Sequence, residues 1–519
     1  MCDYVQIPSL DWAIKSIDHY GDTDIFPIPF EYNAITGYWP EIQAGLSSRD
    51  LSKFSPSASL MILMPKPDGT FRVAKQLDPL DSLLYLAILY EIAPNIEDHR
   101  VSKDLKVACS YRIDIQAEGR IFQEDNGWDD FHQRSKALAE SGQFSCVLTI
   151  DIADFYNQIS HHRIESVLEL ANITQERSKN IEAFLGALTT KFSKGLPVGP
   201  IPSIVLAEAC LDDVDKRLLR KNVKFTRYVD DFRIFCESRD TALKILQDLT
   251  EYLYTSHRLA FQSHKTGILE IDSFTKKELE DPKEEEERTK VKSINDLIEY
   301  FEDQTGYVIT EADIDSDTKA EVTINNLSSL FEQCLNHSSL RLGFARYLLR
   351  KAAKLRTRKI YPMVLANLQY LSPAFRDVCL YFTKTLNEAS TERVKRALED
   401  FLLNNDYGKL PYVRMWALDL IAKKPNLLSF ERAFFLAEDS RRDLGLRPAA
   451  LLAREYKNID WVRGHKEDWN CHNPWERRAI IWAASVLPMD ERKPWLGTIK
   501  DTTSDVLEKA VAIKSLTFQ

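Results

Sequence analysis

The stretch RYVDDFRIF, residues 227–235, decides the fold expected for the rest of this 519-residue chain. Apolar and polar residues alternate before it, in 223–226, and after it, in 232–236, which is the period of a β-strand. The pattern predicts a hairpin whose bend carries Asp230 and Asp231 instead of the usual Asn-Gly or Asp-Gly. Two carboxylates repel each other at a tight bend, and a bound cation would reduce this repulsion. Oxygen ligands at a turn suit Mg²⁺.

An Asp-Asp pair alone is a weak signal, because the chain has two others. We interpret Asp129-Asp130 and Asp212-Asp213 as solvated or helix-capping pairs. The rest of the chain must therefore decide whether the pair at 230–231 has a special role.

Composition limits the class of protein. A hydrophobic content of 44% and an aromatic content of 10% are typical of a folded globular protein. No apolar run reaches the roughly 18 residues of a membrane span, and the N-terminus does not resemble a secretory signal, so we expect a cytoplasmic protein without membrane contact. The eight cysteines lack any C-x-x-C spacing and are expected to be reduced. A net charge of −10 implies that any nucleic acid would bind through local basic patches.

The first half of the chain predicts an α+β domain. Residues 61–73 indicate a strand, a Pro-Asp-Gly turn and a second strand, with Lys66 and Arg72 on opposite limbs. Residues 144–150 form an apolar run that predicts a buried strand ending at Asp151. Shorter strands are expected at 109–113 and within 258–271, and a helix at about 204–221. This order matches a split β-α-β sheet of ferredoxin-like type, in which Asp151 can lie beside the bend at 230–231.

The second half of the chain differs in composition. Residues 276–292 carry a dense charge run and are interpreted as a linker, which leaves 1–275 as the α+β part. From 293 to 519 apolar residues recur at helical spacing, which predicts an all-α domain of helix pairs in the manner of HEAT-like repeats. Within it, residues 341–359 hold eight basic residues and no acidic one. Arg346, Arg350, Lys354 and Arg358 share one helical face, which is either a solvated face or a phosphate-contacting stripe.

Taken together, these motifs resemble those of reverse transcriptases. YVDD at 228–231 is similar to the family's motif C, 151–156 (DIADFY) to motif A, GLPVGP at 195–200 to motif B, and Lys265-Thr266 to motif D. The resemblance covers about residues 60–270 and implies a fingers-palm core in 1–275. It implies nucleotidyl transfer with two Mg²⁺ ions, with Mn²⁺ as an alternative, bound near the catalytic Asp151, Asp230 and Asp231 and at Ile152.

The same resemblance implies a set of nucleotide-binding residues. Lys66 and Arg72 correspond to fingers residues that meet the triphosphate, and Lys265 is a further cation for it. Tyr156 corresponds to the residue that stacks under the sugar and excludes a 2′-hydroxyl; the alternative is an ordinary core aromatic. Asp154, Phe155 and Gly199 complete the implied set.

Two departures narrow the resemblance. Val198 stands where most relatives have Gln, and residues 275–330 do not resemble an ordinary thumb. Together with the negative net charge and the helical C-terminal region, these two departures make the chain most similar to bacterial abortive-infection reverse transcriptases, the prophage-borne type in particular. That group implies phage defence, a homo-oligomer (trimer or hexamer), and untemplated polymerisation of dNTPs into single-stranded DNA attached to the protein.

Alternatives remain open. The chain could be a templated reverse transcriptase of retron type that uses a non-coding RNA, or a catalytically idle scaffold. Retention of all three carboxylates argues against the scaffold. If priming is by protein, the primer should be a mobile tyrosine; Tyr4 fits this by its place near the N-terminus, with Tyr20, Tyr32 and Tyr38 as further candidates.

Overall fold

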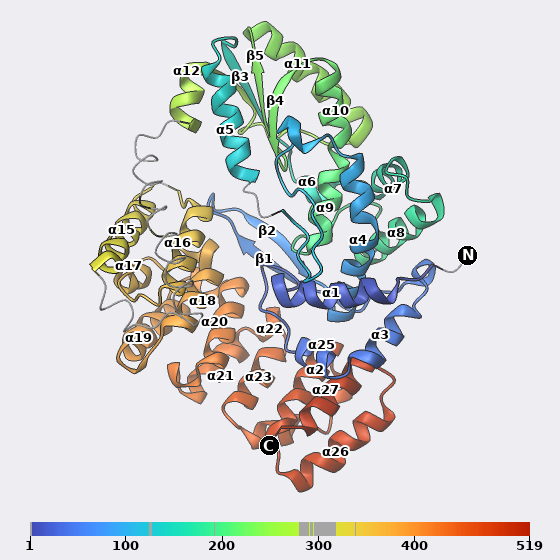
Figure 1. Ribbon diagram of the computed structural model, residues 1–519. Helices are drawn as coiled ribbons and strands as arrows, with labels where there is room; N and C mark the ends of the chain where they lie inside the picture. The colour runs from blue at the N-terminus through green and yellow to red at the C-terminus, as the bar shows by residue number, and fades with distance from the viewer. Residues whose placement is uncertain are drawn as a thin grey trace. The chain divides into compact units, whose positions relative to one another are not determined.

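The protein is described by a computed structural model, which covers residues 3–123, 127–190, 192–279, 318–337 and 339–518, with 290 and 294. Most of the expected linker at 276–292 lies outside the described residues. The chain divides into two compact units (Figure 1). Unit 1 comprises residues 1–24, 40–60 and 75–281, and unit 2 comprises 25–39, 61–74 and 282–519.

Unit 1 contains a four-stranded antiparallel sheet in the order β4-β5-β3-β6. The second strand along the chain lies at one edge and the fourth at the other, with the first and third between them, as a split β-α-β sheet requires. The predicted hairpin and the predicted buried strand are both present. The strands are β3 (Cys146–Asp151), β4 (Lys224–Tyr228), β5 (Asp231–Cys236) and β6 (Gly267–Glu270).

Unit 1 also contains a set of helices, some of which begin at a side-chain cap. The side chain of Ser238 accepts from the backbone N–H of Thr241 at the start of α11, and Asp78 caps α4 in the same way at Leu80. The helices are α1 (Ile7–Tyr20), α3 (Trp39–Ser47), α4 (Pro79–His99), α5 (Gly127–Glu140), α6 (Phe155–Gln158), α7 (His161–Leu170), α8 (Gln175–Leu188), α9 (Ile201–Cys210), α10 (Asp212–Arg220), α11 (Arg239–Tyr252) and α12 (Ile271–Phe274).

Three expectations about local structure differ from the structure. Residues 109–113 form no strand, and Ala108 and Ile113 make only isolated bridges. The backbone N–H of Cys109 instead donates to the carbonyl of Arg227 in β4. The expected strand within 258–271 is confined to β6, since residues 262–266 form a turn in which Lys265 N–H donates to the carbonyl of Gln262. The expected helix at 204–221 is two helices, α9 and α10, that meet at Leu211.

Unit 2 is mostly helical in its described part. Its hairpin, β1 (Leu60–Pro65) and β2 (Phe71–Gln76), confirms the predicted strand-turn-strand at 61–73. The helices are α2 (Glu31–Gly37), α15 (Thr318–Leu335), α16 (Leu342–Lys354), α17 (Tyr361–Ala366), α18 (Phe375–Thr385), α19 (Glu388–Asn404), α20 (Pro411–Lys423), α21 (Phe430–Asp439), α22 (Arg441–Leu444), α23 (Arg447–Glu455), α24 (Ile459–His465), α25 (Pro474–Ala483), α26 (Met489–Thr502) and α27 (Val506–Leu516).

Helices of unit 2 pack in a row, as the yellow-to-red ribbon of Figure 1 shows. Helix α16 packs on α18, α18 on α20, α20 on α23, α23 on α25 and α25 on α27. Stacking of this kind gives a continuous core in helical solenoids. HEAT-like identity of the repeats stays a prediction.

The row of helices includes a segment from the N-terminal part of the chain. Helix α2 packs on α27, and the buried carboxylate of Glu31 binds Arg447 through two hydrogen bonds of 2.7 Å. The indole N–H of Trp416 donates to the carbonyl of Ile25. Residues 25–39 therefore belong to the helical unit, although the expected boundary at 275 had placed them with the α+β part.

Candidate active site

The two carboxylates at the centre of the prediction are neighbours in the sheet. Asp151 ends β3 and Asp231 begins β5, and these residues are directly paired in the antiparallel register. Tyr228 pairs with Asp231 from the other side, and Asp230 occupies the bend between β4 and β5. Directly paired residues point to the same face of a sheet, so Asp151 and Asp231 share one face.

The carboxyl group of Asp231 has a raised pKa. Burial raises its pKa to about 6, the nearby Arg233 opposes this rise, and the negative charges of Glu278, Asp151 and Asp230 add to it. Arg233 itself lies 4.3 Å over the ring of Phe131 and 3.6 Å from Glu278. The grouping of these negative charges at one place favours the binding of a cation.

Lys265 places a positive charge beside these carboxylates. Its Nζ donates to Asp151 Oδ2 over 2.7 Å, and its own side chain is 56% exposed. Burial would lower the pKa of Lys265, but the hydrogen bond and charge of Asp151 outweigh it and the pKa is raised. The turn that carries Lys265 is fixed to the strand end, because Gln262 N–H donates to the carbonyl of Asp151.

The donor set fits a divalent metal ion. Asp151, Asp230 and Asp231 offer only carboxylate oxygens, which hard cations such as Mg²⁺ or Mn²⁺ prefer. In the described part of the chain the ligand atoms of these three residues do not all lie within 4.8 Å of one another, whereas those of the surface group His162, Glu165 and Glu182 do. Because one oxygen of Asp151 is held by Lys265, a cation at this site would compete with that ammonium group. A role for Ile152, which bridges Phe261, stays a prediction.

The loops that resemble motifs A and B are joined by backbone hydrogen bonds. Asp154 has a positive φ of 49°, and its carboxylate accepts from the side-chain amides of Asn157 and Gln158. The backbone carbonyl of Asp154 accepts the N–H groups of the same two residues at the start of helix α6. The carbonyl of Tyr156 accepts from Leu196 N–H at 2.9 Å. The ring of Tyr156 is half-buried and packs edge-on against the buried ring of Phe155. Tyr156 therefore lies at the junction of these two loops.

Gly199 is required by its surroundings. Its φ is 129°, and a Cβ here would lie 2.6 Å from Thr23 Oγ1 and 3.4 Å from the carbonyl of Lys75. The neighbouring Val198 accepts a hydrogen bond from Lys75 N–H at 3.1 Å. The loop at 195–200 is thus fixed from both sides. Whether Gly199 contacts a nucleotide stays a prediction.

Two groups of expected binding residues belong to unit 2, whereas the three carboxylates belong to unit 1. Lys66 and Arg72 lie at the hairpin of unit 2, so their contact with a triphosphate stays a prediction. In the basic stripe, Arg346 and Arg350 both donate to the buried Asp377, over 2.9 and 2.8 Å. These two arginines compensate the charge of the buried Asp377 carboxylate. The sequence analysis had considered only a solvated face or a phosphate-contacting stripe. Nucleic-acid contacts of the stripe, with Lys354 and Arg358, stay a prediction.

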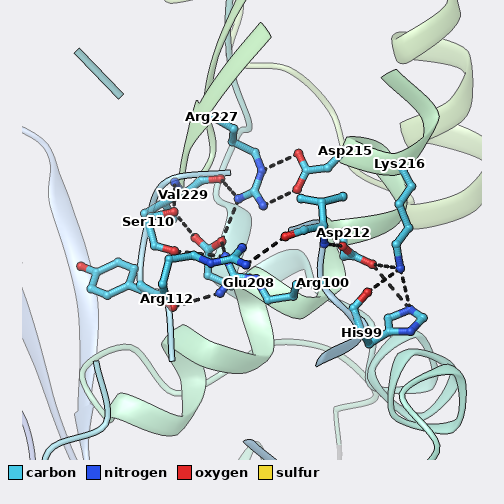
Figure 2. Close-up of polar contacts among 12 residues, drawn as sticks. His99, Arg100, Ser110, Arg112, Glu208, Asp212, Asp215, Lys216, Arg227 and Val229 are labelled. Carbon is cyan, nitrogen blue, oxygen red and sulfur yellow. Dashed lines mark hydrogen bonds and ion pairs between the residues drawn. The ribbon is translucent and has the colours of Figure 1, made fainter. Parts of the chain in front are cut away.

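Sequence reasoning missed a buried polar cluster behind the bend. Figure 2 shows Arg227 of β4 meeting Glu208 of α9 and Asp215 of α10, with Ser110 and Arg100 beside them. Asp212 is also buried and pairs with Lys216 at 2.7 Å, so its interpretation as a solvated or merely capping residue was wrong. The available signal was Arg227 itself, a charged residue inside a strand that is otherwise apolar on that face.

Comparison with known families identifies the class of this site. Residues 64–295 match the family described as reverse transcriptase (RNA-dependent DNA polymerase). The chain therefore carries a reverse transcriptase domain, and this class of enzyme is a nucleotidyltransferase. The match begins in the β1–β2 hairpin and includes all four strands of the sheet.

Individual relatives are distant. The retron Ec48 reverse transcriptase of Escherichia coli is 26% identical over 214 residues, which are 40% of this chain and 48% of that protein. The chain thus spans about half the length of this curated relative. Among solved structures, telomerase from Candida albicans with a fragment of telomeric RNA is similar at a TM-score of 0.34 and 12% identity, covering 75% of this chain and 71% of that one. Apo telomerase from Candida tropicalis gives 0.33 and 11%, with 83% and 72% covered.

None of the helices in the described part of the chain combines the length and apolar composition that a bilayer span requires.

Proposed function

We propose that the chain polymerises deoxynucleoside triphosphates by metal-assisted nucleotidyl transfer. The observation that carries this proposal is the direct pairing of Asp151 with Asp231 at adjacent strand ends, beside Asp230 in the bend. Carboxylates from two strands meet the main requirement of a two-metal site. Asp151, Asp230 and Asp231 would hold two Mg²⁺ ions, or Mn²⁺, which when bound stabilise the charge of the attacking and leaving oxygens.

The protein's own groups bind and orient the substrate. Lys265, once released from Asp151, would contact the triphosphate, with Lys66 and Arg72 as the further cations. Tyr156 lies under the sugar and excludes a 2′-hydroxyl, while Asp154, Phe155 and Gly199 shape the nucleotide pocket. The proposed roles of Tyr156 and Gly199 are supported by the junction of the 151–156 and 195–200 loops at Tyr156.

The finer proposal is an untemplated, protein-primed polymerase that acts in phage defence. It is supported by Val198, which replaces the usual Gln in the motif B-like loop, and by the net charge of −10, which disfavours binding along a long nucleic-acid duplex. A covalent primer makes the meeting of the growing end with the site intramolecular. Tyr4 is 41% exposed near the N-terminus, whereas Tyr32 is 6% exposed, which favours Tyr4 over Tyr32 as primer. A homo-oligomer, trimer or hexamer, and a cytoplasmic location belong to this proposal.

A retron-type, RNA-templated reverse transcriptase is the second candidate. The match to the retron Ec48 reverse transcriptase over 214 residues favours it. Both candidates use the same carboxylates and differ in template and primer.

One assay separates these candidates. Purified protein is incubated with Mg²⁺ and each labelled dNTP, with and without an added RNA template, and the products are run on a denaturing gel before and after protease treatment. Product that forms without template and stays with protein until protease is added supports the finer proposal. Free DNA that requires the template supports the retron-type candidate, and no incorporation under any condition contradicts both.

A further inference from the structure

The bend between β4 and β5 is supported from behind by a buried cluster of five side chains, here called the bend cluster: Arg100, Ser110, Glu208, Asp215 and Arg227 (Figure 2). All are less than one tenth exposed, and Arg227 is fully buried. Arg227 donates to Asp215 through Nε at 2.8 Å and through Nη2 at 2.5 Å. Arg227 Nη1 and Arg100 Nη2 both donate to Glu208 Oε2, at 3.0 and 2.9 Å.

This cluster holds both main-chain polar groups of one residue of the bend. Arg227 Nη1 donates to the carbonyl of Val229 at 2.8 Å. The N–H of Val229 donates to Ser110 Oγ, also at 2.8 Å, and Ser110 Oγ in turn donates to Glu208 Oε1 at 2.5 Å. The two contacts to Val229 therefore meet at the carboxylate of Glu208.

Val229 needs such support because its backbone is strained. Its φ is 56°, in the left-handed region, and a β-branched residue is an outlier there. Conformations of this kind are unfavourable and persist only where the surroundings hold them. Val229 immediately precedes Asp230 and Asp231, so any relaxation of its backbone would turn both carboxylates.

We infer that Ser110, Glu208 and Arg227 are positioning residues, which set the direction of the Asp230 and Asp231 carboxylates through the backbone of Val229. The inference rests on the proposed function, in which these carboxylates bind metal. Residues that orient metal ligands from behind typically change metal affinity about 10- to 100-fold when removed.

Ser110→Ala is the sharpest test, because it removes one hydroxyl and leaves every charge in place. The matched control is Ser135→Ala. Ser135 is equally buried, and its hydroxyl contacts the carbonyl of Phe131 and Thr226 Oγ1 beside β4, away from the bend. Ser110→Cys keeps the volume and a weaker donor, and it serves if the alanine variant does not fold.

Mn²⁺ binding is measured by electron paramagnetic resonance without nucleotide, and thermal melting of each variant is recorded. Binding to the Asp230→Asn, Asp231→Asn double variant is subtracted, which removes the contribution of surface groups such as His162, Glu165 and Glu182. We expect Ser110→Ala to bind Mn²⁺ about tenfold more weakly and Ser110→Cys to be intermediate, whereas Ser135→Ala binds like the wild type. If the two alanine variants lower the melting temperature equally, the difference in Mn²⁺ binding assigns the effect to positioning.

Three results would overturn the inference: unchanged Mn²⁺ affinity in Ser110→Ala, equal losses in both alanine variants, or wild-type affinity in the double asparagine variant. The test is independent of polymerisation. A wild type that binds Mn²⁺ in this pattern but incorporates no dNTP would contradict the proposed function alone. A polymerase that Ser110→Ala leaves fully active at limiting Mg²⁺ would contradict the inference alone.

Discussion

Lys265 Nζ donates a hydrogen bond of 2.7 Å to Asp151 Oδ2, so a cation of the protein occupies one oxygen of a predicted metal ligand. The two residues are 114 positions apart and meet because the backbone of the 260–262 segment pairs with that of 151–153. The ammonium group and a divalent ion would compete for the same carboxylate. Lys265 therefore has two expected partners, Asp151 before metal binds and the triphosphate afterwards.

Replacing Lys265 should separate these two roles. In Lys265→Ala the competition at Asp151 is removed, so Mn²⁺ should bind roughly twofold to fivefold more tightly, as expected for an exposed ion pair. Incorporation of dNTP at saturating metal should nevertheless fall, because a cation for the triphosphate is lost. Titration of Mn²⁺ binding beside initial rates checks both. Weaker Mn²⁺ binding in the variant would contradict the competition.

The raised pKa of Asp231 predicts a pH-dependent stability. Its value is about 6 in the folded protein, against an ordinary 3.8. Between these values the folded state binds more protons than the unfolded state, so stability contributed by the protonated carboxyl is lost as pH rises through 6. Asp231→Asn lacks this loss, and its stability relative to wild type should increase by about 1 kcal/mol between pH 5 and pH 8.

Denaturant unfolding in EDTA at the two pH values measures this difference. Asp130→Asn is a suitable control, because Asp130 also lies in an Asp-Asp pair but is paired with Lys106 at 2.7 Å on the surface. Stability curves of Asp231→Asn and wild type that run parallel from pH 5 to pH 8 would be inconsistent with the raised pKa.

Tyr156 provides a test of sugar selection. If its ring lies under the sugar, Tyr156→Ala should raise the ratio of ribonucleotide to deoxyribonucleotide incorporation, whereas Tyr156→Phe should keep the wild-type ratio. Competition between labelled rNTP and dNTP measures this ratio. An active alanine variant with an unchanged ratio would make Tyr156 a packing residue only.

The central part of the site was predictable because it depends on local patterns. Alternation on both sides of residues 228–231 predicted the hairpin, and the apolar run before Asp151 predicted the adjacent strand. The bend cluster was not predictable in this way, because Glu208, Asp215 and Ser110 come from separate segments that meet only in the folded chain. For the same reason, the pairing of Asp377 with Arg346 and Arg350 was missed: the basic face was visible in the sequence, and its internal acidic partner was not.

The assignment of residues 25–39 to the helical unit leads to a stability prediction. Glu31 is fully buried and binds the buried Arg478 and the mostly buried Arg447, so Glu31→Gln removes the negative charge that both guanidinium groups share. Loss of one partner from a buried ion pair costs about 3–5 kcal/mol. Chemical denaturation should show this loss, whereas Glu392→Gln, on the surface of α19, should change stability little. Equal stability of the two variants would contradict the role of Glu31 in unit 2.

The most direct test of the proposed function compares two Asp-Asp pairs of the same chain. Asp230→Asn with Asp231→Asn is measured beside Asp129→Asn with Asp130→Asn for incorporation of labelled dNTPs in Mg²⁺. The account predicts that the first variant folds and incorporates no detectable nucleotide, while the second retains wild-type activity. Wild-type incorporation by the folded Asp230→Asn, Asp231→Asn variant would contradict it.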